Sequence, residues 1–130
     1  MADLLKRWSV EKASELYRVA EWGGGYFRVS ENRDMLVLPS PNAVDRAVSI
    51  PRIVEGLKER GLDMPVLLRI DNILDAQISQ LNETFIAAMK TLGYRGQFLG
   101  AYPIKVNQQK QVIGGVVHYG KPYHHGLEAG

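Results

Sequence analysis

A lysine follows the end of a predicted apolar strand in residues 101–109 (AYPIKVNQQ). We predict a strand over residues 97–102, after which Pro103 and Lys105 precede a polar turn into a helix. Parallel sheets and barrels gather their functional groups at the carboxyl ends of the strands. Desolvation there lowers the pKa of an amine, which can then act as a nucleophile or form an imine. Spacing alone favours the structural alternative, a strand-end lysine whose ammonium reaches solvent.

Charged residues also follow the other two predicted strands of the same region. Arg69 and Asp71 lie at the end of a predicted strand over residues 66–70, and Glu128 ends a predicted strand over residues 124–128. Lysine and glutamate on adjacent strand ends can come within ion-pair distance, so Lys105 and Glu128 form either a site or a structural salt bridge. The residue types alone slightly favour the salt bridge. Arg69 and Asp71 are interpreted only as polar groups at a strand end.

Four stretches carry a resemblance to one enzyme family. The run YPIKVNQQ (residues 102–109) resembles the cofactor-lysine segment of biosynthetic arginine decarboxylases, pyridoxal-phosphate enzymes built on an alanine-racemase-like barrel. WGGGYF (22–27), PVLLRI (65–70) and GKPYHHGLEAG (120–130) agree with it in order and spacing. The lysine segment and GLEAG are specific, whereas PVLLRI alone would be weak. Family members are several times longer, so the sequence resembles an amino-terminal piece that ends inside the barrel.

The resemblance implies a cofactor, a substrate and two site residues. Lys105 matches the lysine that binds pyridoxal 5'-phosphate as an imine, so it is expected to be both catalytic and cofactor-binding. Glu128 stands where related barrels have an acidic residue near that lysine, and it is expected to be cofactor-binding. The implied reaction converts L-arginine to agmatine and CO2 in polyamine biosynthesis. The resemblance also implies a homo-oligomeric intact enzyme and is compatible with Mg²⁺.

Two other interpretations of the function remain open. One is another amino-acid decarboxylase or racemase that binds pyridoxal phosphate on the same barrel, although YPIKVNQ and WGGGYF favour the arginine enzyme. The other is a non-catalytic binding module derived from the half-barrel. We identify no phosphate cup, no acidic partner for the pyridine nitrogen and no second domain in the sequence, so we expect the 130-residue chain to be inactive alone.

The composition predicts a cytoplasmic globular protein. Of the 130 residues 45% are hydrophobic and 23% charged, and the net charge of +2 is too small to indicate nucleic acid or an anionic membrane as a partner. The absence of cysteine fits a reducing compartment. No apolar stretch approaches the roughly 20 residues of a membrane span, and residues 1–9 lack the apolar run of a secretory signal.

The first part of the chain, residues 1–62, predicts a helix, a hairpin and a second helix. Ser9 can cap a helix whose apolar residues recur at helical spacing, and the glycine triplet 23–25 then predicts a turn. Residues 26–29 and 35–38 predict the two strands of a hairpin. Ser49 can cap a helix over residues 51–60, which Gly61 ends.

The second part, residues 63–130, predicts alternating strands and helices. Apolar runs at 66–70, 97–102 and 124–128 indicate buried parallel strands, and residues 75–92 and 108–119 indicate the helices between them. This βαβαβ order is typical of an α/β fold. We therefore predict the first, parallel units of a (β/α)8 TIM-type barrel, truncated at its C-terminal end and preceded by the helix and hairpin segment.

Three further patterns predict no site. The glycine triplet lacks the flanking strand, helix and Lys-Ser/Thr pair of a phosphate loop. His118, His124 and His125 do not have metal-ligand spacing, since adjacent histidines on a strand point to opposite faces. Asn82 begins an Asn-Glu-Thr triplet that matches the glycosylation pattern but lies within a predicted helix, so we interpret it as a chance match.

Overall fold

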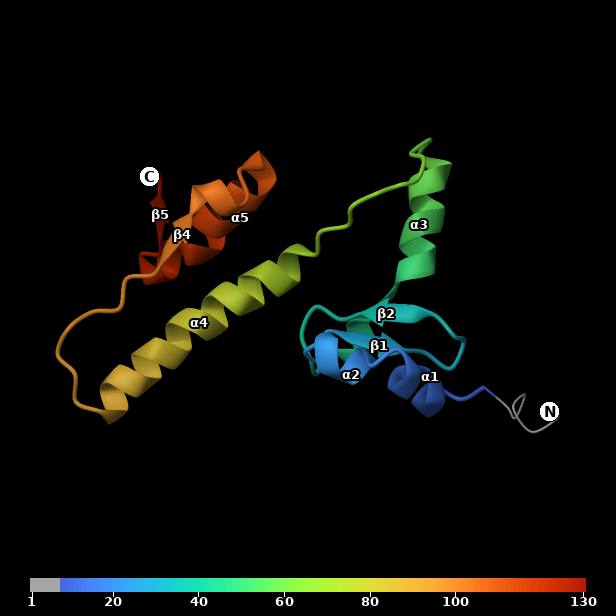
Figure 1. Cartoon of the computed structure of the whole chain (residues 1–130), viewed down its shortest axis with the longest axis horizontal. Helices are drawn as coiled ribbons and strands as arrows, with labels where there is room; N and C mark the ends of the chain where they lie inside the picture. The colour runs from blue at the N-terminus through green and yellow to red at the C-terminus, as the bar shows by residue number, and fades with distance from the viewer. Residues whose placement is uncertain (1–7) are drawn as a thin grey trace. The chain divides into compact units, whose positions relative to one another are not determined.

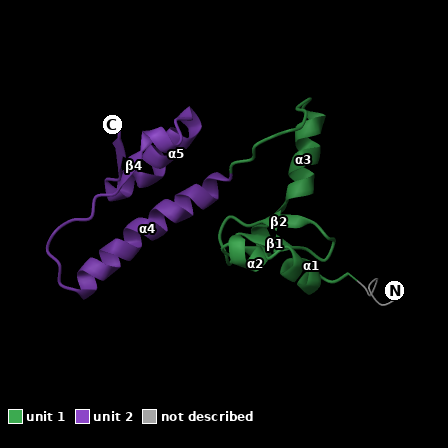
Figure 2. Cartoon of the chain, viewed as in Figure 1, with its two compact units in different colours: residues 1–69 green, residues 70–130 purple. Residues whose placement is uncertain are grey.

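The computed structural model describes residues 8–130, which form two compact units. The first unit ends at Arg69 and the second runs from Ile70 to Gly130 (Figure 2). Our predicted division falls seven residues earlier, between residues 62 and 63. The segment that we judged not to be a secretory signal lies largely outside the described residues. Among the described helices, none combines the length and apolar character that crossing a membrane requires.

Two short helices open the first unit. Helix α1 (Val10–Leu16) is capped as predicted, because the Ser9 hydroxyl accepts a hydrogen bond from the backbone N–H of Lys12 at 3.1 Å. Hydrogen bonds from its own backbone N–H and from the Ser9 hydroxyl lower the pKa of the Glu11 carboxyl. Helix α2 (Val19–Trp22) follows after Arg18, whose φ of 52° is left-handed. This left-handed residue separates the two helices.

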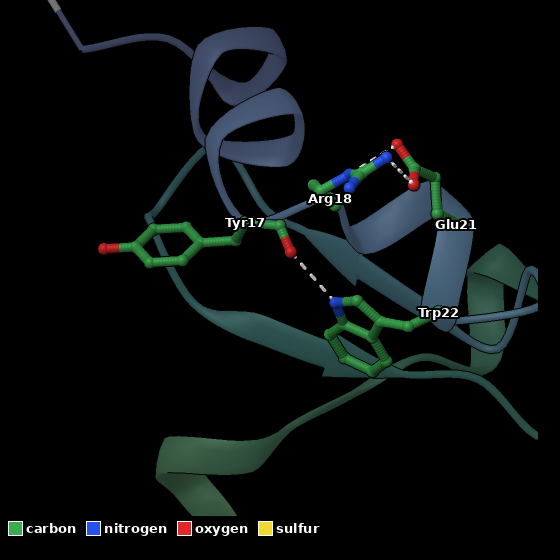
Figure 3. A network of polar contacts seen from close by, with 4 residues as sticks. All are labelled: Tyr17, Arg18, Glu21 and Trp22. Carbon is green, nitrogen blue, oxygen red and sulfur yellow. Dashed lines mark hydrogen bonds and ion pairs between the residues drawn. The ribbon is translucent and has the colours of Figure 1, made fainter.

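A polar network stabilises the junction between α1 and α2 (Figure 3). The indole Nε1–H of Trp22 donates to the backbone oxygen of Tyr17 at 3.0 Å. The guanidinium of Arg18 pairs with the Glu21 carboxylate, with Nε donating to Oε1 at 2.8 Å. Because both charged side chains are more than half exposed, the ion pair contributes little to stability. The Trp22 hydrogen bond joins the C-cap residue of α1 to the last residue of α2.

The predicted hairpin is confirmed and gains a third strand. Strands β1 (Phe27–Val29) and β2 (Met35–Val37) pair antiparallel, and β3 (Val48–Ser49) pairs antiparallel with β2 (Figure 1). Val37 and Leu38 are almost completely buried. The core of the first unit therefore lies beside this small sheet, and its other buried apolar residues are Ala13, Val19, Tyr26 and Ala43.

The glycine triplet forms the predicted turn between α2 and β1. Gly24 and Gly25 have φ values of +54° and +81°, which side-chain-bearing residues rarely adopt. A Cβ on Gly25 would also lie 3.0 Å from Cβ of Pro41. The turn brings the Trp22 ring to 5.1 Å from that of Phe27. WGGGYF is therefore a structural motif in this chain.

The single turn η1 (Val44–Arg46) precedes β3, and a well-capped helix, α3 (Ile50–Glu59), is the last regular element of the first unit. The Ser49 hydroxyl accepts from the backbone N–H of Arg52 and donates to Oδ2 of Asp34 at 2.7 Å. Gly61, with φ of +74°, follows the helix, and the N–H of Leu62 returns to the oxygen of Leu57. Both ends of the predicted helix are thus confirmed to within a residue.

The second unit contains two packed helices and a parallel pair of strands. Helix α4 (Asp71–Thr91) packs against α5 (Lys110–Gly120), and strand β4 (Ala101–Pro103) pairs parallel with β5 (Gly126–Glu128) (Figure 1). The single turn η2 (Ile104–Val106) follows β4, and η3 (Lys121–Tyr123) links α5 to the residues before β5. Phe85 of α4 stacks on Phe98 at 4.1 Å between ring centroids.

The predicted strand over residues 66–70 is wrong for this chain. These residues are in neither helix nor strand and belong to neither sheet, and Leu67 is 72% exposed. A strand exists only where a neighbour completes its hydrogen bonds, which apolar character alone does not provide. The other two predicted strands are shorter than expected, at 101–103 and 126–128. The complete barrel remains a prediction.

Candidate active site

Lys105 lies directly beyond the carboxyl end of strand β4, in the single turn η2. Its side chain is exposed and has no hydrogen-bond or ion-pair partner among residues 8–130. Pro103 ends the strand and cannot donate a further ladder hydrogen bond, so the chain turns there. The structure therefore presents the Lys105 amine at the edge of the parallel pair, without the desolvated surroundings expected from the sequence.

Glu128 ends the neighbouring strand β5 at the same edge. In the parallel register its Cα pairs with that of Pro103, two residues before Lys105. The Glu128 side chain is exposed, and no ion pair joins it to Lys105. The structure thus brings the two predicted site residues to adjacent strand ends, and the salt-bridge alternative is not observed. Both groups are accessible to a ligand at this edge.

A histidine just before β5 occupies the space beside two glycines. The backbone N–H of His125 donates to the oxygen of Gly120 at 3.0 Å, and the N–H of Gly126 donates to the oxygen of Gly100 at 2.8 Å. A Cβ on Gly100 would clash with Nδ1 of His125, and one on Gly120 would lie 2.7 Å from Cβ of His125. His125 therefore packs between the start of β4 and the end of α5.

Asn82 of helix α4 reaches the same histidine from within the unit. Its side chain is fully buried, and Nδ2 donates to the backbone oxygen of Ile78 at 2.8 Å and lies 3.4 Å from Nδ1 of His125. Its Oδ1 has no hydrogen-bond partner among the described residues. Because the amide is buried, the Asn-Glu-Thr triplet cannot serve as a glycosylation acceptor in this fold. The contact between Asn82 and His125 was not predicted from the sequence. The available signal was Asn82 itself, a polar residue on the apolar face of α4.

The remaining charged candidates have structural positions. Asp71 begins helix α4, where a carboxylate is favoured by the helix dipole, and not at a strand end as expected. His118 contacts the ring of its neighbour Tyr119 at 5.1 Å. Within residues 8–130 there is no group of three or more His, Cys, Asp or Glu side chains placed to hold a metal ion. No metal site can be assigned to these residues.

Comparison with known proteins identifies relatives over almost the whole chain. The biosynthetic arginine decarboxylase of Gloeobacter violaceus is 36% identical over 97% of this chain, and that of Pelobacter propionicus is 37% identical over 97%. The enzyme of Deinococcus radiodurans is 42% identical over 91%. The chain spans 17–20% of the length of these relatives. No family model matches the chain.

These similarities show that the chain is a relative of amino-acid decarboxylases. Within that class its relatives are the biosynthetic arginine decarboxylases, and the chain corresponds to about a fifth of such an enzyme. The resemblance of YPIKVNQQ and GLEAG to this family is thereby confirmed.

Proposed function

We propose that this chain forms part of a pyridoxal-phosphate-dependent decarboxylase that converts L-arginine to agmatine and CO2. The observation that carries the proposal is the position of Lys105, whose free amine follows β4 at the edge where Glu128 ends β5. Similarity to biosynthetic arginine decarboxylases over nearly the whole chain supports the substrate and the reaction. The names of these relatives favour decarboxylation over the racemase alternative.

The residues present fit the lysine side of a pyridoxal-phosphate site. A cofactor aldehyde requires an accessible primary amine, and Lys105 is exposed without a partner among residues 8–130. Lys105 would hold the cofactor covalently, and Glu128 would approach it from the adjacent strand. When bound, the cofactor supplies an electron sink for the carbon that loses CO2. We assign no residue of this chain to the cofactor phosphate, because the glycine triplet is occupied by its own turn.

Lys105 and Glu128 would have different roles in that site. The Lys105 amine would hold the cofactor by its aldehyde and orient it. The Glu128 carboxylate can stabilise positive charge on the nitrogen that Lys105 provides, or hold a proton at one of its oxygens. Glu128 ends β5 and Lys105 follows the end of β4, so the pairing of these two strands supports a shared site.

The remaining properties of the intact enzyme belong to the same proposal. We expect a cytoplasmic homo-oligomer, in which a second copy or the rest of the polypeptide covers the apolar surface exposed here. We assign no Mg²⁺ site, since the described residues contain no suitable cluster of ligands. The 130-residue chain alone is proposed to be inactive, because it spans about a fifth of the length of its relatives.

A substrate panel tests the proposed function. The intact decarboxylase that contains this chain would be incubated with pyridoxal phosphate and, separately, with L-arginine, L-ornithine and L-lysine. We expect CO2 and agmatine from L-arginine at a rate at least about a hundredfold above the other two, since the pocket must recognise a guanidinium. Preferred turnover of ornithine or lysine, or formation of D-arginine without CO2, would contradict the proposal.

A further inference from the structure

A polar contact within the second unit joins Asn82 to one ring nitrogen of His125. The amide nitrogen of Asn82 has two hydrogens, of which one donates to the oxygen of Ile78 at 2.8 Å. The same nitrogen lies 3.4 Å from Nδ1 of His125. An amide nitrogen only donates, so Nδ1 must be the acceptor. In a neutral imidazole, which carries one N–H, this arrangement leaves the proton on Nε2.

Two glycines leave room for this imidazole. Neither Gly100 nor Gly120 has a left-handed φ, so the backbone conformation does not require glycine at either position. The required feature is space, because a Cβ would approach the His125 ring or its Cβ to within 2.7 Å. The ring is thus confined between the residue before β4 and the last residue of α5.

The confined histidine lies at the point where β5 begins. Its own N–H is bonded to Gly120, and the following N–H, that of Gly126, is bonded to Gly100. Ala101 and Gly126 are the first register partners of the parallel pair. A displacement of His125 would therefore shift the start of β5 against β4 and move Glu128 relative to Lys105.

We infer that Asn82 and His125 are a positioning pair for the edge that carries Lys105 and Glu128. Asn82, whose amide is bonded to the oxygen of Ile78, keeps the His125 imidazole in its Nε2–H form. The imidazole, confined beside Gly100 and Gly120, sets the register of β5 on β4. The catalytic consequence of this positioning rests on the proposed function. The tautomer and the register do not, because they follow from contacts within the second unit.

Nitrogen NMR of the 130-residue chain with labelled histidine tests the tautomer. We expect Nδ1 of His125 to be unprotonated and Nε2 to carry the proton. Asn82→Asp cannot donate to the ring, so it should move the proton to Nδ1, and Asn82→Ala should give a mixture of tautomers. His118→Ala, a change at an exposed histidine within α5, is the control and should leave the His125 signals unchanged. A protonated Nδ1 or a tautomer mixture in the wild-type chain would overturn the inference.

A pair of substitutions tests the register independently of Asn82. Gly100→Ala should lower the hydrogen-exchange protection of the Gly126 amide, because the new Cβ would displace the His125 ring. His125→Ala should lower that protection as well, and the double variant Gly100→Ala with His125→Ala should lose no more than Gly100→Ala alone, since both changes act through the same ring. Gly114→Ala has no atom within 4 Å of its Cβ and serves as the control. Protection that is unchanged in His125→Ala, or losses that add in the double variant, would contradict the role of His125. If the substrate panel gave no decarboxylation of L-arginine, only the catalytic role of this positioning would be lost, and the tautomer and register would still stand.

Discussion

Glu128 lies opposite Pro103 in the parallel register of β5 and β4, and Lys105 follows Pro103 by two residues. The pairing therefore carries a carboxylate and an amine to one edge of the two strands without an ion pair between them. An amine without a partner can react with an aldehyde, whereas a salt-bridged lysine would first have to break its pair. This relationship strengthens the argument from the sequence that Lys105 is the cofactor lysine.

Replacement of Glu128 by glutamine tests the second half of the site. In the intact enzyme we expect Glu128→Gln to lower turnover of L-arginine by about 10²-fold, a usual loss when a group that handles a proton is removed. Cofactor should remain attached to Lys105, because glutamine conserves the shape of the side chain. Glu59→Gln, at the end of α3, is the matched control. Unchanged turnover in Glu128→Gln would show that the carboxylate has no role.

The caps of α3 and α1 should differ in their contributions to stability. Ser49→Ala removes a helix cap and also the 2.7 Å hydrogen bond to Asp34, so we expect a loss of about 1–2 kcal/mol in the free energy of unfolding. Ser9→Ala removes a more exposed cap and should cost less, about 0.5–1 kcal/mol. Urea unfolding of the two variants measures the difference. A loss in the free energy of unfolding for Ser49→Ala that is equal to or smaller than the loss for Ser9→Ala would contradict a stabilising role of the Ser49–Asp34 hydrogen bond.

Adjacent glycines in α5 should respond in opposite ways to alanine. Gly114→Ala places a methyl group in open space within a helix, so we expect a gain of about 0.5–1 kcal/mol in the free energy of unfolding. Gly115→Ala would bring a methyl group to 2.9 Å from Cδ2 of Leu74 on α4, which should offset or reverse that gain. Thermal unfolding compares them, and a larger gain at Gly115 would contradict the close packing of α4 and α5.

The isolated chain should associate as its concentration rises. Several large apolar side chains are strongly exposed, including Leu92 at 81%, Leu67 at 72% and Val106 at 68%. Exposed apolar surface and an open strand edge both favour association. Sedimentation velocity of the chain across a range of concentrations measures this. A monomer that unfolds cooperatively at every concentration would disprove the prediction.

Local patterns in the sequence predicted the first unit well. Ser9 and Ser49 signal helix starts, Gly61 signals a helix end, and the alternating runs around residues 30–34 signal a hairpin. Each of these features depends on residues close together in the chain. Helix α4 began four residues earlier than predicted because Ile70, its N-cap, forms no side-chain cap that the sequence could reveal.

Features that depend on distant residues were less predictable. The apolar run at residues 66–70 indicated a buried strand, yet the segment pairs with no strand in the described part of the chain. The parallel edge that joins Lys105 and Glu128 was predicted from strand order and is present. Asn82 and His125 were not predicted as a pair, because 43 residues separate them and only the packing of α4 brings them together.

Mapping the cofactor attachment site tests the central claim most directly. The intact enzyme would be reduced with borohydride in the presence of pyridoxal phosphate, digested and analysed by mass spectrometry. We predict that the pyridoxyl group is found on Lys105 and that Lys105→Ala abolishes both labelling and turnover, while Lys110→Ala, an exposed lysine at the start of α5, leaves both intact. A pyridoxyl group on any other lysine, or turnover retained in Lys105→Ala, would contradict the assignment.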